Sequence, residues 1–134
     1  MRRVLAVLGV LFLAGCAAMR ALTGAPPVYA VFFDGPEMTL TANGRVIVDD
    51  AAKDAREHPL MYVQITGPST KSAKGYDPAL AEARMRIVEQ TLVADGIPAE
   101  RQFRTEPTPD MLMNDPTGRQ RVEIRIVAAR PASS

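Results

Sequence analysis

The chain has 134 residues, of which 47% are hydrophobic and 23% are charged. That length supports one modest hydrophobic core, so we expect a single domain. The formal net charge is +1, which gives no basic bias for a nucleic-acid partner or for anionic lipid. Cys16 is the only cysteine, so an internal disulfide is excluded.

The N-terminus has the pattern of a signal peptide. Arg2 and Arg3 are followed by an apolar run, Val4–Leu13, that is too short to span a bilayer. The run leads into Leu-Ala-Gly-Cys, ending at Cys16, which resembles a bacterial lipoprotein signal. The resemblance implies that residues 1–15 are removed and that Cys16 carries diacylglycerol and palmitate. An ordinary secretory signal cleaved near Ala17 or Ala18 is the alternative.

The segment after Cys16 is predicted to be a short tether. Removal of residues 1–15 takes away two arginines and no acid, which leaves 14 basic and 15 acidic side chains, a net charge of −1. Membrane attachment is therefore expected to come from the lipid on Cys16. The eleven residues Ala17–Pro27 reach about 35 Å when extended. Ala17 and Ala18 follow the cysteine where an aspartate would imply inner-membrane retention, so the resemblance implies sorting to the outer membrane.

Four segments have strand character. Val28–Phe33 is rich in β-forming residues and apolar on both faces, which predicts an inner strand. Leu60–Thr66 and Arg121–Val127 alternate apolar and polar residues, which predicts one buried face each. Arg101–Thr105 predicts a short strand.

Residues 39–48 allow two interpretations. Asn43-Gly44 between two β-prone runs is typical of a hairpin, whereas a helix from Thr41 to Glu57 would place Ile47, Ala51 and Ala55 on one face. The pattern alone leaves both open. His58, before Pro59, is expected to cap the end of that helix and not to bind a metal, because no second metal-binding residue accompanies it.

Tyr76–Pro98 predicts the clearest helix. Asp77 is a favourable N-cap with Pro78 at the first helical position, and Gly96 with Pro98 ends the helix. Arg84 falls in the middle of its apolar stripe. Either Arg84 recognises an anionic ligand, or it pairs with a nearby Asp or extends to water, and both interpretations remain open.

Together these elements predict an α+β fold, a two-layer α/β sandwich of βαβαβ type with helices on one face of a mixed sheet. We expect a signal peptide at 1–15, the lipidated cysteine and tether at 16–27, one domain at 28–128 and a disordered tail at 129–134.

The order and spacing of several short blocks resemble the OmpA-like domain, the peptidoglycan-associated module of outer-membrane protein A and of peptidoglycan-associated lipoproteins. The resemblance covers residues 28–127 and favours the helix over the hairpin at residue 41. The blocks that carry it are Val31–Asp34, Leu40–Thr41, Val63–Gly67, Tyr76–Leu80 with Arg84 and Val88, Leu92–Arg101, and Arg121–Ile124.

In that family, a loop aspartate in a Gly-His-Thr-Asp motif and a helix arginine bind the diaminopimelate of the peptidoglycan stem peptide. Arg84 matches the arginine. The aspartate is absent, because Ser69 or Thr70 stands in its place. We therefore expect a degenerate ligand site at Arg84, Ser69 and Thr70, with Asp77 as the substitute acid and Arg121 as a further candidate.

The resemblance implies a lipid-anchored outer-membrane protein with its domain in the periplasm and peptidoglycan as partner. The alternative is a domain that has lost peptidoglycan binding and serves as a structural or protein-interaction module of the envelope. No cofactor is expected. The sequence has one histidine, and its one cysteine is the predicted lipidation site. It therefore offers no plausible acid–base or nucleophilic set, and we expect no enzyme.

Overall fold

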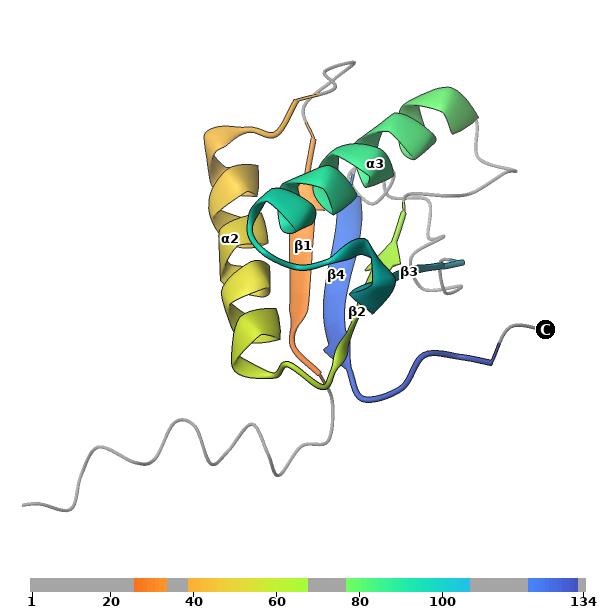
Figure 1. Ribbon diagram of the computed structural model, residues 1–134. Coiled ribbons are helices and arrows are strands. Elements are labelled where there is room, and N and C mark those ends of the chain that lie inside the picture. The colour runs from red at the N-terminus through yellow and green to blue at the C-terminus, as the bar shows by residue number, and fades with distance from the viewer. Residues whose placement is uncertain (1–25, 34–38, 68–76, 107–120, 133–134) are drawn as a thin grey trace, which may run out of the picture.

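A four-stranded mixed sheet with two helices on one face makes up the domain in the computed structural model (Figure 1). The structure describes residues 26–33, 39–67, 77–106 and 121–132. The strands are β1 (Val28–Phe32), β2 (Tyr62–Thr66), β3 (Gln102–Thr105) and β4 (Arg121–Val127). The helices are α2 (Ala42–Glu57) and α3 (Pro78–Ala94), with a 3₁₀ turn, η1 (Ala99–Arg101), before β3. The predicted two-layer α+β fold is confirmed.

The strand order is β1-β4-β2-β3, with β4 antiparallel to both of its neighbours and β2 parallel to β3. Within the described residues, β1 is therefore an edge strand, and the expectation of an inner strand was wrong. Its second apolar face is not covered by a helix, and Phe32 on that face stays exposed while Val31 is fully buried. The two end strands β1 and β3 leave the inner positions to β4 and β2.

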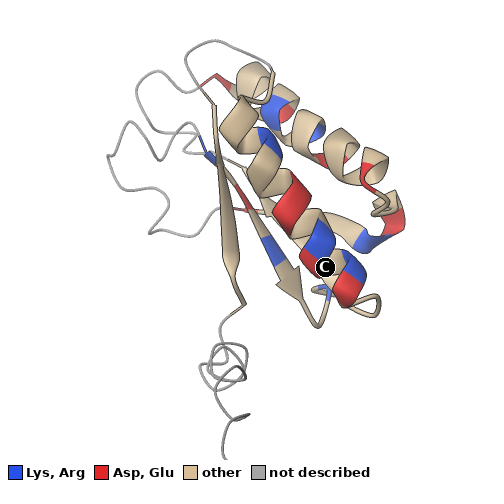
Figure 2. Cartoon of the chain, turned by 90° about the vertical axis from the view of Figure 1, so that its left-hand side faces the viewer, with Lys and Arg blue, Asp and Glu red and all other residues tan. Residues whose placement is uncertain are grey.

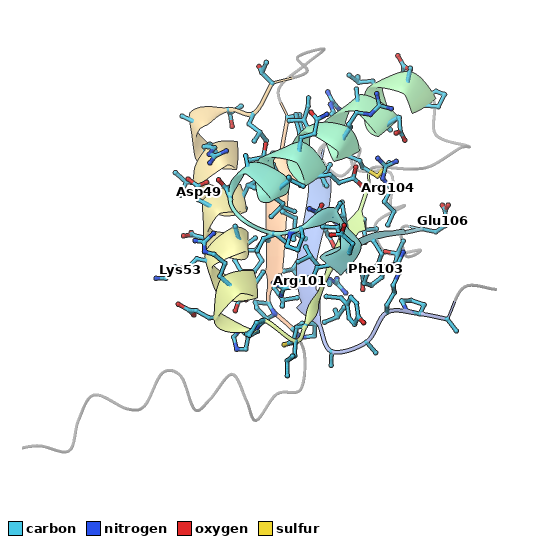
Figure 3. The ribbon with its side chains drawn as sticks, viewed as in Figure 1. Asp49, Lys53, Arg101, Phe103, Arg104 and Glu106 are labelled. Carbon is cyan, nitrogen blue, oxygen red and sulfur yellow. The ribbon has the colours of Figure 1, made fainter. Side chains whose placement is uncertain are left out.

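Helix α2 replaces the alternative hairpin. The Thr41 hydroxyl accepts a hydrogen bond from Gly44 N at 2.9 Å and so caps the helix start. Small side chains line its buried side, which lets the helix lie close to the sheet: Gly44, Val48, Ala51, Ala52 and Ala55. Asp49 and Lys53 point away from the sheet (Figure 3). His58 is the C-cap, as expected, and its N–H donates to Asp54 O.

Helix α3 begins and ends where its signals are. Asp77 is the N-cap and Pro78 the first residue, and Asp95 is the C-cap. Gly96 has φ +92°, a left-handed conformation that a residue with a Cβ rarely adopts. Arg45 and Arg56 of α2 both reach this end, Arg45 to the Asp95 carboxylate and Arg56 to its carbonyl, each at 2.6 Å. The end of α3 is thereby fixed against α2.

Arg104 ties the edge strand β3 to α3. Its guanidinium contacts Glu89 through two nitrogens at 2.5 and 2.8 Å and Glu82 at 2.6 Å. Hydrogen bonds to these carboxylates raise the pKa of Arg104, and the same contact lowers the pKa of Glu82. The short strand is held by this network as well as by its pairing with β2 (Figure 3).

Residues 128–132, after β4, have no regular secondary structure. Arg130 lies over the Phe103 ring, with 5.8 Å between its Cζ and the ring centroid, and Phe103 meets Tyr62 edge to face. The residues after β4 therefore contact the sheet face opposite the helices. The predicted signal peptide, Cys16 and most of the tether lie outside the described residues, so those boundaries remain predictions.

Candidate functional site

Arg84 lies on the inner side of α3, in line with Ala81, Val88 and Leu92. Only 3% of Arg84 is exposed, and its aliphatic neighbours on this side of the helix are core residues. The spacing of three or four residues along the helix explains the placement, because these positions share one face. A cation is thus built into the helix–sheet interface.

Phe33, directly after β1, supports the Arg84 guanidinium. The distance from Arg84 Cζ to the centroid of its ring is 5.3 Å, within the range of a cation–π interaction. Phe33 itself is fully buried against the core. Burial lowers the pKa of Arg84, but an arginine starts so high that the side chain stays charged at neutral pH. We call Arg84 with Phe33 the Arg84 site.

Asp77 is used as a helix cap. Its Oδ1 accepts hydrogen bonds from Ala79 N at 2.9 Å and from Leu80 N at 3.2 Å. Asp77 precedes Arg84 by seven positions, which is about 10 Å along the helix axis. The described contacts of Asp77 are therefore those of an exposed cap, two turns away from the guanidinium. Ser69 and Thr70, and also Asp34 after Phe33, lie outside the described residues.

Arg121 lies on the other face of the sheet. On β4, Val122, Ile124 and Ile126 point into the core under the helices, so Arg121 and Glu123 alternate to the helix-free face. Arg121 Nε is 3.0 Å from Glu123 Oε1. The structure therefore does not bring Arg121 together with Arg84.

Two neighbours of Arg84 were not among the predicted site residues. Phe33 lies 51 positions away in the chain, and the pattern of the first strand marks it only as apolar. Met85 packs on Gly67 at the end of β2, where an added Cβ would lie 2.3 Å from Met85 Sδ. A side chain at position 67 would therefore require the Met85 side chain to shift.

The Arg84 site could recognise an anion. A buried guanidinium presents a planar set of donors that matches a carboxylate, and low polarity around it strengthens that interaction. Among the described residues, no group of three or more His, Cys, Asp or Glu could hold a metal ion. None of the described helices is long and apolar enough to cross a membrane.

The chain is similar to several solved structures. The OmpA-like domain of FopA1 from Francisella tularensis matches with a TM-score of 0.60 at 18% identity, over 77% of this chain and 75% of that one. The peptidoglycan-associated lipoprotein from Burkholderia pseudomallei gives 0.55 at 19%, over 74% and 88%. The periplasmic domain of Helicobacter pylori MotB gives 0.55 at 13%, over 78% and 82%. No family model and no curated protein matches the sequence.

These matches define the class of the domain as α+β with the OmpA-like fold. The identities, below 20%, establish the fold and leave the ligand to be argued from the Arg84 site. The resemblance seen in the sequence is confirmed at this level.

Proposed function

We propose that the protein is a lipid-anchored envelope protein whose OmpA-like domain binds the stem peptide of peptidoglycan through Arg84. The observation that carries this proposal is the buried Arg84 guanidinium stacked on Phe33, at the helix position where the resemblance places the ligand arginine. The planar donors of a guanidinium match a carboxylate, so an anionic group of the stem peptide is the ligand chemistry that Arg84 would recognise. The similarity to a peptidoglycan-associated lipoprotein supports the same ligand class.

Binding to purified sacculi tests the role of Arg84. The wild-type protein is expected to sediment with sacculi, and Arg84→Ala to bind roughly ten- to hundredfold more weakly, because a charge-assisted pair with the ligand carboxylate is lost. Arg86→Ala is the matched control: Arg86 is on the same helix but exposed, and its side chain contacts Glu82 at 3.2 Å.

Thermal unfolding of each variant separates lost binding from lost folding. Arg84→Lys keeps the charge without the planar donors, so its retention should fall between those of wild type and Arg84→Ala. Equal retention of wild type and Arg84→Ala would remove Arg84 from the site.

Labelling with radioactive palmitate tests the proposed anchor. In a Gram-negative host, the wild-type chain should incorporate label and fractionate with the outer membrane, whereas Cys16→Ala should lose both, because Cys16 is the only thiol. Ala17→Ser leaves the thiol in place and is the control. A wild-type chain that is processed but found unlabelled in the soluble periplasm would support the ordinary secretory signal instead.

The burial of Arg84 also supports a second candidate function. Arg84 is nearly inaccessible, and the Asp77 carboxylate is occupied by its own helix. Both features are also expected of a domain that has lost its ligand and serves as an interaction module of the envelope. In that case the wild type would fail to bind sacculi, and Arg84→Ala would change only stability.

A further inference from the structure

The charges of the described residues are divided between the two layers. The helix layer, taken as α2 and α3 with the caps Asp77 and Asp95, is acidic overall (Figure 2). Its charged side chains are five basic ones, Arg45, Lys53, Arg56, Arg84 and Arg86, against eight acidic ones, Asp49, Asp50, Asp54, Glu57, Asp77, Glu82, Glu89 and Asp95. A net charge near zero for the whole chain therefore hides an asymmetry.

The opposite side, the helix-free face of the sheet, carries arginines. Arg121, Glu123 and Arg125 follow one another along this side of β4, and Arg130 lies over Phe103. The Glu123 side chain is only 8% exposed, whereas those of Arg121 and Arg125 are 27% and 35% exposed. The acid is thus covered and the cations are presented, so a flat surface approaching this face meets positive charge.

Exposed apolar side chains flank these arginines. Val28 and Phe32 of β1 are 46% and 39% exposed, and their Cα partners on β4 are Arg125 and Arg121. Each arginine is therefore next to an apolar side chain on the same face. We call this set the basic sheet face: Val28, Phe32, Arg121, Arg125 and Arg130.

We propose that the basic sheet face docks on the anionic phospholipid surface of the membrane to which the chain is anchored. Arginines attract anionic headgroups, and apolar side chains beside them can enter the interfacial region. The sequence order agrees, because the predicted tether Ala17–Pro27 ends directly before Val28, which lies on this face, and eleven residues reach about 35 Å at most. The proposal rests on the proposed lipid anchor, which keeps the face near the bilayer.

Docking in this way would set the orientation of the Arg84 site. Arg84 and Phe33 lie on the helix side of the sheet, so they would face away from the anchoring membrane. The basic sheet face would thus orient the domain, while the lipid on Cys16 holds it.

A single tryptophan tests the proposal, because the chain contains none. Phe32→Trp places the reporter on the basic sheet face, and Val46→Trp places a matched one on the exposed side of α2. The lipidated full chain would be reconstituted in vesicles of phosphatidylglycerol and phosphatidylcholine in equal parts, or of phosphatidylcholine alone. We expect a blue shift and protection from acrylamide only for Phe32→Trp with phosphatidylglycerol, with loss of both at about 0.5 M salt.

Combining Arg121→Gln, Glu123→Gln and Arg125→Gln in the Phe32→Trp chain should abolish the shift without leaving a buried acid unpaired. Either of two results would overturn the proposal: an equal shift on phosphatidylcholine, or an equal shift for Val46→Trp. A concentration-dependent shift without vesicles would also overturn it, because it would indicate that a second copy of the chain covers this face. Failure of the proposed anchor is detected separately, because mass spectrometry would then show a chain without lipid on Cys16. In that case, vesicles added to the chain still test the face, and sacculus binding is read independently.

Discussion

Replacing Phe33 with alanine is expected to lower the free energy of unfolding by about 3–5 kcal/mol. The ring is fully buried and lies under the Arg84 guanidinium, so its removal leaves a cavity and takes away the aromatic contact of Arg84. A domain of this size has about 5–15 kcal/mol in total, so the variant should be marginally folded. Urea unfolding followed by circular dichroism measures the change.

Phe32→Ala is the control for Phe33→Ala. The two residues are adjacent, but Phe32 lies on the helix-free face and is exposed, so its truncation should cost about 1 kcal/mol or less. Similar losses for the two variants would contradict the assignment of faces. Phe33→Leu keeps most of the apolar volume, costs about 1.5 kcal/mol or less, and removes only the aromatic support of Arg84.

Local signals in the sequence predicted most of the fold. The ends of α3 follow from Asp77, Pro78 and Gly96, each of which acts on backbone groups within a few residues. For α2 the local pattern also allowed a hairpin, and the resemblance was needed to favour the helix. The half-buried strands follow from their alternation. These features depend on neighbours in the chain, so they can be read without knowing the packing.

The position of β1 could not be predicted in this way. A strand that is apolar on both faces fits an inner position, and the pattern holds no information on which strands pair. In the structure, Val28 and Phe32 lie on the face that neither of the described helices, α2 and α3, covers. Their exposure has no local signal, because it depends on where the helices pack.

The Arg84 site was partly predictable. Arg84 itself stands out as a charge in an apolar stripe, and its burial confirms that position. Phe33 could not be assigned, because nothing local links it to α3. Arg121 was proposed from the resemblance. Its alternation with Val122 predicts that the two side chains lie on opposite faces of the strand. The burial of Val122 and the register with β1 show that Arg121 lies on the face away from the core.

Replacing Arg101 with methionine is expected to cost about 2–3 kcal/mol of stability. Its guanidinium donates to three backbone carbonyls, those of Ala55 at 2.9 Å, His58 at 3.0 Å and Met61 at 2.8 Å, with a further bond from Nε to Met61 O at 3.0 Å. These oxygens belong to the end of α2 and the turn into β2, where helical partners run out. Methionine keeps the stem volume but supplies no donor.

Arg56→Met is the matched control, since Arg56 is exposed and makes a single described hydrogen bond, to Asp95 O. It should cost within about 1 kcal/mol. Arg101→Lys distinguishes charge from geometry: one ammonium cannot reach all three carbonyls, so less than half of the loss should be recovered. Full recovery by lysine would show that attraction of a cation to the helix end is sufficient, and faster hydrogen exchange at the Met61 amide in Arg101→Met would locate the loss at this turn.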